Sequence, residues 1–231
     1  MESEPLQANE QTNGASLTQK FLAELIGTAF LVFIITGTAV FGISYGSIYA
    51  AFVLCSMIYV FGRISGGHFN PAVTIPMFLR QKISLMECIY YIIAQISGGF
   101  IGSILVGLCN SVSFKDMAGN CVANDDGKGF FSAFLIEVIL TFGLVFVIFA
   151  STIKANNFGN LTGLIVGISL FFLGIAGGNV SGGSLNPARS IAPAIIQAFD
   201  GSKKPLKQLW LYILAPIIGG VAAGYLNILF E

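Results

Sequence analysis

The chain has 231 residues, with 11 basic and 11 acidic side chains, one histidine and a formal net charge of zero. Only 10% of its residues are charged, against about 25% in a typical soluble domain, while 55% are hydrophobic and the mean hydropathy is +0.83. This composition excludes a disordered chain, and the neutral charge balance excludes a nucleic-acid-binding protein. Because the apolar residues form long runs rather than short alternating segments, the sequence predicts an all-α membrane protein and not a membrane barrel.

Residues 1–19 are predicted to be a disordered tail, because the chain begins with polar and acidic residues and lacks the basic start of a signal peptide. Residues 20–231 are predicted to form a single domain, with halves at about 20–109 and 131–231 joined by a polar loop over 110–130. Cys109 and Cys121 flank this loop and could pair if it faced an oxidising space. The four cysteines and the single histidine lack metal-ligand spacing, so no metal and no cofactor are expected.

Six apolar runs are long enough to cross a membrane, which takes about 20 residues per helix. In chain order they are predicted over residues 21–41, 48–63, 87–109, 131–152, 161–178 and 208–230. Two further segments, 66–79 and 182–196, are too short to cross and are rich in Gly, Pro and Asn, which is typical of re-entrant segments. Six spans put both termini on one side. Five cationic residues fall on each side, so the positive-inside rule does not orient the chain.

The two halves of the sequence repeat each other in the same order. The segment GGHFNPAVT at Gly66 recurs as GGSLNPARS at Gly182, 116 residues later, and ELIGT at Glu24 recurs as EVILT at Glu137, 113 residues later. Each half therefore holds three spans and one re-entrant segment. The odd number of spans inverts the second half relative to the first, and inverted repeats of this kind carry their functional site near the bilayer midplane.

Each repeat holds one Asn-Pro-Ala motif, formed by Asn70, Pro71 and Ala72 in the first half and by Asn186, Pro187 and Ala188 in the second. Asn is a preferred helix N-cap and Pro is favoured at the first helical position, so each motif is predicted to start a half-helix. In an inverted repeat the two N-termini face each other at mid-membrane. Their partial positive charge opposes a cation, the asparagine amides offer donors to a neutral guest, and the small alanines allow the half-helices to approach.

Two Asn-Pro-Ala motifs in matching places of an inverted repeat closely resemble the aquaporin, or major intrinsic protein, family. The resemblance covers Lys20 to the C-terminus and implies the aquaporin fold, with six transmembrane helices and two re-entrant half-helices. It implies that Glu24 and Glu137 support the re-entrant loops by accepting backbone N–H groups, although a pair of membrane-embedded carboxylates is also compatible with proton transport. It further implies that the loop backbone lines the pore, at Gly66, Gly67, His68, Gly182 and Ser184.

The family's selectivity constriction falls at four positions of this chain, which are Ala50, Gly174, Gly183 and Arg189. A lone arginine at membrane depth should line a watery cavity or form a structural pair, and the resemblance implies that Arg189 is a donor and a cation barrier. The three small residues predict a wide opening unless a neighbour fills it, as in plant nodulin-type members that pass bulky neutral solutes. Other positions resemble water channels, and a register slip would bring Tyr49 or Phe172 into the constriction.

We therefore expect a passive, non-enzymatic channel for water, with small uncharged solutes such as glycerol, urea or ammonia. The alternatives are a gated or closed family member with an adhesion or sensing role, and a proton-coupled transporter that uses Glu24 and Glu137. The resemblance also implies a homotetramer in the lipid bilayer of a plasma or vacuole membrane, with cytoplasmic termini.

Overall fold

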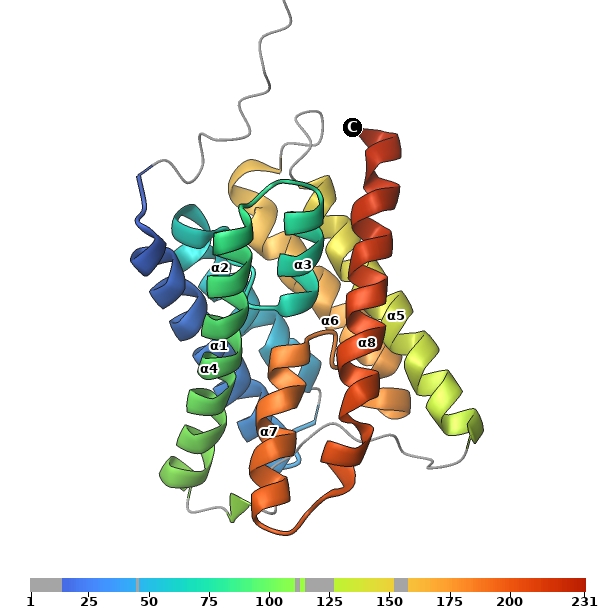
Figure 1. Ribbon diagram of the computed structural model, residues 1–231. Helices are drawn as coiled ribbons and strands as arrows, with labels where there is room; N and C mark the ends of the chain where they lie inside the picture. The colour runs from blue at the N-terminus through green and yellow to red at the C-terminus, as the bar shows by residue number, and fades with distance from the viewer. Residues whose placement is uncertain (1–13, 45, 111–112, 115–126, 152–157) are drawn as a thin grey trace, which may run out of the picture.

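The computed structural model describes residues 14–44, 46–110, 113–114, 127–151 and 158–231, and every regular element within these ranges is a helix (Figure 1). The long helices are α1 (Leu17–Val40), α2 (Gly46–Ser65), α4 (Leu85–Asn110), α5 (Gly127–Ala150), α6 (Thr162–Ser181) and α8 (Lys204–Leu226). Short 3₁₀ turns, η3 (Gly159–Leu161) and η4 (Asn227–Phe230), adjoin α6 and α8. All six long helices are long and apolar enough to cross a membrane, so the expected all-α membrane fold is confirmed.

Three helices, α1, α5 and α8, begin four residues before their predicted spans. The first helix begins at Leu17, because Ser16 and Gln19 form a reciprocal capping box in which Gln19 N donates to Ser16 Oγ at 3.2 Å. Residues 17–19 therefore belong to the membrane domain rather than to the tail. Helix α5 begins at Gly127 rather than at residue 131, and helix α8 begins at Lys204 rather than at residue 208. Residues 1–13 and Cys121 lie outside the described residues, as does the pairing considered for Cys109.

Two short helices, α3 (Pro71–Leu79) and α7 (Pro187–Phe199), occupy the two re-entrant segments. Their N-terminal ends face each other in the middle of the bundle, and α3 runs toward the top of Figure 1 while α7 runs toward the bottom. The described chain begins and ends at the top of the same view, as expected for six crossings. This arrangement brings both Asn-Pro-Ala motifs to one level.

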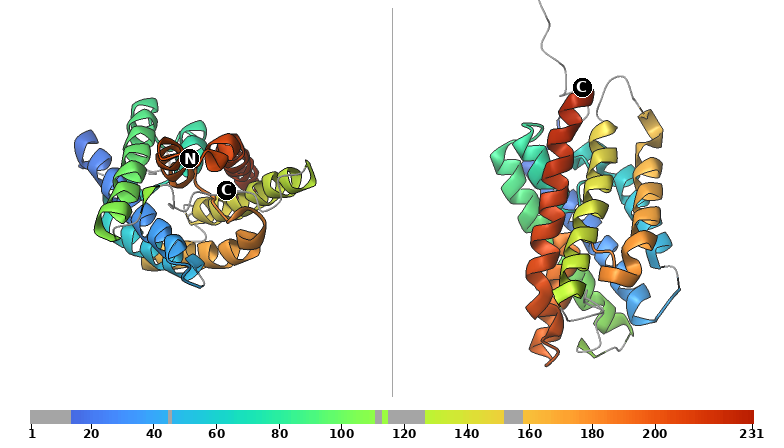
Figure 2. Two further views of the ribbon diagram at one scale, coloured as in Figure 1. Left: turned by 90° about the horizontal axis from the view of Figure 1, so that it is seen from below. Right: turned by 90° about the vertical axis from the view of Figure 1, so that its right-hand side faces the viewer.

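The two halves pack in similar ways, and each short helix contacts long helices of both halves. Helix α1 lies along α4 just as α5 lies along α8, while α3 packs against α8 and α7 packs against α4 (Figure 2). Glycines permit these close crossings, since a Cβ on Gly98 would strike the backbone of α1 at Leu25 and a Cβ on Gly219 would strike α5 at Val138. The interlocking fixes both half-helices relative to the long helices.

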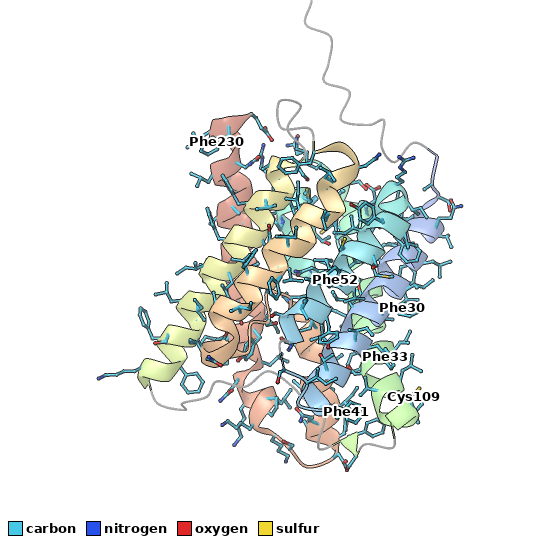
Figure 3. All side chains as sticks on the ribbon, turned by 180° about the vertical axis from the view of Figure 1, so that it is seen from behind. Phe30, Phe33, Phe41, Phe52, Cys109 and Phe230 are labelled. Atoms are coloured by element: carbon cyan, nitrogen blue, oxygen red, sulfur yellow. The ribbon has the colours of Figure 1, made fainter. Side chains whose placement is uncertain are left out.

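The outer surface of the bundle is apolar. Phe30 on α1 is 52% exposed and Phe52 on α2 is 62% exposed, and both side chains point away from the bundle (Figure 3). A water-soluble protein does not leave aromatic side chains exposed along whole helices, so this surface faces lipid or another subunit. Polar and charged groups are instead buried in the centre, among them Glu24, Glu137 and Arg189.

Candidate functional site

Each motif asparagine caps its half-helix. Asn70 Oδ1 accepts from Ala72 N at 2.8 Å, and Asn186 Oδ1 accepts from Ala188 N at 3.0 Å. Both asparagines have extended backbone and are followed by proline at the first helical position. The side-chain oxygens are thereby committed to the helix starts, and each side chain is left with its amide donors.

The two asparagines also join the halves of the chain. Asn70 Nδ2 donates to the Leu185 carbonyl at 2.7 Å, and Asn186 Nδ2 donates to the Phe69 carbonyl at 2.9 Å. An amide nitrogen carries two hydrogens, so one N–H per asparagine remains for a guest. Both asparagines line the central cavity.

The loops that precede the half-helices have unusual backbone. Phe69 has φ 50° and Leu185 has φ 53°, in the left-handed region that non-glycine residues rarely adopt. Gly66, Gly67, Gly182 and Gly183 also have positive φ. Such a conformation persists only where the surrounding contacts stabilise it. It also makes successive peptide N–H and C=O groups of each loop point in different directions.

The two buried glutamates hold these loops. Glu24 accepts from His68 N at 2.9 Å and from Phe69 N at 2.6 Å, and both of its oxygens are fully buried. Glu137 accepts from Ser184 N at 2.7 Å and from Leu185 N at 2.8 Å. Neither carboxylate is among the residues that line the cavity. The two carboxylates thereby accept from buried loop N–H groups that have no partner in a helix.

Further residues support the same loops and were not predicted from the sequence. Ser65 donates to Glu24 and Ser181 to Glu137, each at 2.6 Å. The hydroxyl groups of Tyr91 and Tyr212 donate to the carbonyls of these two serines, each at 2.7 Å. Both pairs obey the internal repeat, so a residue-by-residue comparison of the two halves would have revealed them.

One part of the network differs between the halves. Gln95 Nε2 donates to Glu24 Oε2 and to Thr74 Oγ1, both at 2.8 Å, and Thr74 Oγ1 lies 3.1 Å from His68 Nδ1. The Thr74 hydroxyl, which can both donate and accept, thus links Gln95 of α4 to the ring of His68. In the second half, Pro216 stands where the first half has Gln95.

A cavity of about 1510 Å³ follows the bundle axis from one end to the other. Lys20, Arg63 and Glu87 line its mouth near the termini, and Ile43 and Asn179 line the opposite mouth. Between these ends its wall includes both motif asparagines and the expected loop residues Gly66, Gly67, His68, Gly182 and Ser184. Pro71, Ala72, Pro187 and Ala188 are buried but lie away from the cavity wall, where Ala188 and Ala72 contact Gly99 and Gly220 of the long helices.

All four expected constriction residues, Ala50, Gly174, Gly183 and Arg189, line this cavity. Arg189 is the charged member and is 9% exposed. Tyr49 is 43% exposed and Phe172 is 63% exposed, and neither lines the cavity. These two aromatic side chains thus lie on the outer surface, away from the cavity.

The two glycines of this set face backbone and a neighbouring side chain. A Cβ on Gly174 would lie 2.9 Å from Ser47 Cβ, and a Cβ on Gly183 would lie 3.3 Å from the Gly174 carbonyl oxygen. Gly183 also has φ 57°, which favours glycine. Ser47 is thus the neighbour that takes up space beside Gly174. No local pattern predicts this contact, because the two residues are 127 positions apart.

Comparison with known proteins agrees with this architecture. The family model described as "Major intrinsic protein" matches residues 11–227. A glycerol uptake facilitator protein-like 6 from Lactiplantibacillus plantarum is 42% identical over 90% of this chain and 95% of its own, and an aquaporin Z from Photorhabdus laumondii is 36% identical with the same coverage. The structure of the aquaglyceroporin from Plasmodium falciparum superposes with a TM-score of 0.82 at 24% identity, over 92% of this chain and 96% of that one, and so shares its fold.

Proposed function

The chain belongs to the major intrinsic protein family, and we propose that it is a passive channel for water and small uncharged solutes. One observation carries the proposal. A cavity whose lining reaches both ends of the bundle passes the two asparagine caps, and each Nδ2 uses only one of its two hydrogens in the contacts between the halves. A water or hydroxyl oxygen accepts from such donors without any change of the protein.

The same geometry disfavours cations. Two half-helix N-termini direct partial positive charge toward the middle of the cavity. Arg189 adds a full positive charge at its wall, at a depth where charge is weakly screened. We propose that these two barriers together exclude cations and protons, while Ala50, Gly174, Gly183 and Arg189 form the constriction.

We assign Glu24 and Glu137 to the support of the loops. Each carboxylate accepts two backbone N–H groups and one serine hydroxyl and lies off the cavity wall. A proton carrier would need access to the cavity, so this position argues against a proton-coupled transporter. The cavity, whose lining includes residues at both ends of the bundle, likewise argues against a closed member with an adhesion or sensing role.

The proposal includes glycerol, urea and ammonia as solutes, because Ala50 leaves the constriction with a small side chain and one relative at 42% identity is named for glycerol uptake. It also includes a homotetramer with cytoplasmic termini. Helices α2 and α6 are the least buried of the six spans and lie side by side, which gives a neighbouring subunit an apolar face to cover.

Purified protein in liposomes tests the proposed solute range. Shrinkage under an impermeant osmolyte measures water flux, and swelling after the addition of glycerol measures solute flux. We expect both fluxes to exceed those of empty liposomes by at least about tenfold. Ala50→Phe should lower glycerol flux far more than water flux, because a phenyl ring enters the constriction. Wild-type liposomes that pass water but exclude glycerol would restrict the proposal to water, and liposomes that pass neither would refute it.

A further inference from the structure

The contact between Ser47 and Gly174 affects the width of the constriction. A Cβ added to Gly174 would lie 2.9 Å from Ser47 Cβ, which is closer than Cβ atoms normally approach another heavy atom. Position 174 is therefore small because α2 lies against α6 at this point, and its lack of a side chain does not by itself widen the pore. The side chain that stands there belongs to α2.

The crossing of α2 and α6 explains why Ser47 is held in this place. A Cβ on Gly167 would lie 2.8 Å from the Ala51 carbonyl, and a Cβ on Gly163 would lie 3.3 Å from the Cys55 carbonyl. Glycines at 163, 167 and 174 thus follow one face of α6 and bring the backbone of α2 close along several turns. Ser47 lies at the end of this contact where the cavity opens opposite the termini.

Ser47 also contributes polarity to the wall. It lines the cavity with Ala50 and Arg189, and its hydroxyl has no hydrogen-bond partner among the residues that the structure describes. A serine hydroxyl both donates and accepts, whereas Arg189 only donates and Ala50 does neither. A solute that carries hydroxyl groups needs both kinds of partner when it leaves water.

We infer that Ser47 is a fifth specificity-determining residue of the constriction, which sets the width and polarity of the wall beside Gly174. The inference rests on the proposed channel function and deepens it. Its solute class is small polyols, whose hydroxyl groups exchange hydrogen bonds with Ser47 during passage. Gly174 is the packing partner that makes room for this serine.

Two substitutions at Ser47 test the inference, with the same changes at Ser56 as matched controls. Ser56 lies on the same helix, is exposed, does not line the cavity, and donates to the Phe52 carbonyl at 2.8 Å. Ser47→Ala should lower the ratio of glycerol to water permeability about two- to tenfold, the range expected when one net hydrogen bond is lost. Ser47→Leu should lower water permeability itself at least about tenfold, because its side chain extends into the path. Ser56→Ala and Ser56→Leu should change neither flux.

An exchange of the two side chains tests the packing directly. Gly174→Ser should reduce the yield of folded protein or its water flux, and the double variant Ser47→Gly, Gly174→Ser should restore it, because the clash is relieved. A double variant as defective as Gly174→Ser alone, or a Ser47→Leu variant with wild-type water flux, would overturn the inference. If the wild type passes water but not glycerol, the proposed solute range fails, while the Ser47→Leu and exchange experiments still decide the role of Ser47.

Discussion

Asn70 donates its side-chain amide to the carbonyl of Leu185, the residue that precedes Asn186, and Asn186 returns the same contact to Phe69. Each half of the chain therefore completes the re-entrant loop of the other. The bonds measure 2.7 and 2.9 Å and lie in the buried centre of the bundle. The same two asparagines therefore stabilise the fold and shape the pore.

Asn70→Asp and Asn186→Asp should each destabilise the protein and lower water flux. The substitution replaces an amide donor with a carboxylate that faces a carbonyl oxygen, and a buried unsatisfied group costs about 1–3 kcal/mol, more when it is charged. Thermal unfolding in detergent and liposome shrinkage measure the two effects. Asn179→Asp makes the same chemical change at an exposed position of the cavity mouth and should leave thermal stability unchanged. Wild-type stability in both motif variants would mean that the cross-links between the halves are dispensable.

Arg189→Val should admit protons or monovalent cations. Valine is chosen because Val73 holds the matching position of the first repeat and also lines the cavity. The substitution removes the fixed charge of the wall but leaves both half-helix N-termini in place. Proton flux into liposomes that hold a pH-sensitive dye measures the leak, with Arg63→Val at the mouth near the termini as a control for general loss of charge. If Arg189→Val still excludes protons, the half-helix N-termini alone account for the exclusion of protons and cations.

We expect Thr74, which accepts from Gln95, to donate its hydroxyl hydrogen to His68 Nδ1, so that His68 holds its own hydrogen on Nε2. His68 is the only histidine, so ¹⁵N-histidine labelling yields one pair of ring signals. Thr74→Val removes the donor to Nδ1 and should shift these signals toward a mixture of tautomers. Thr141→Val, at a buried hydroxyl without a partner among the described residues, should leave them unchanged. A wild-type spectrum with the hydrogen on Nδ1 would contradict this expectation and make Thr74 the acceptor.

Gly98→Ala and Gly219→Ala should each destabilise the bundle by about 1–3 kcal/mol, the usual cost of overpacking. A Cβ at either position would strike the backbone of the helix beside it, α1 or α5. Gly178→Ala is the control, because a Cβ there meets nothing within 4 Å and alanine is the better helix former by about 1 kcal/mol. Unfolding in mixed detergent measures the difference. Equal stability of Gly98→Ala and Gly178→Ala would show that α1 and α4 can separate without cost.

The sequence by itself determined the membrane class, the six spans, the inverted repeat and the two half-helices. These features depend on composition, on the length of apolar runs and on capping residues such as Asn70 and Asn186, all of which act over a few neighbouring positions. The repeat also identified Glu24 and Glu137 as equivalent residues, because an inverted duplication places matching positions in matching surroundings.

Only the tertiary structure decided which side chains form the wall of the constriction. From the sequence, glycine at position 174 predicts open space in the constriction. In the structure, Ser47 occupies the adjoining space because α2 and α6 cross closely there. The link from Gln95 to His68 likewise depends on α4 lying against α3. Contacts of this kind arise from the distance and angle between helices far apart in the chain. Those are set by the packing of whole helix faces rather than by any local pattern of residues.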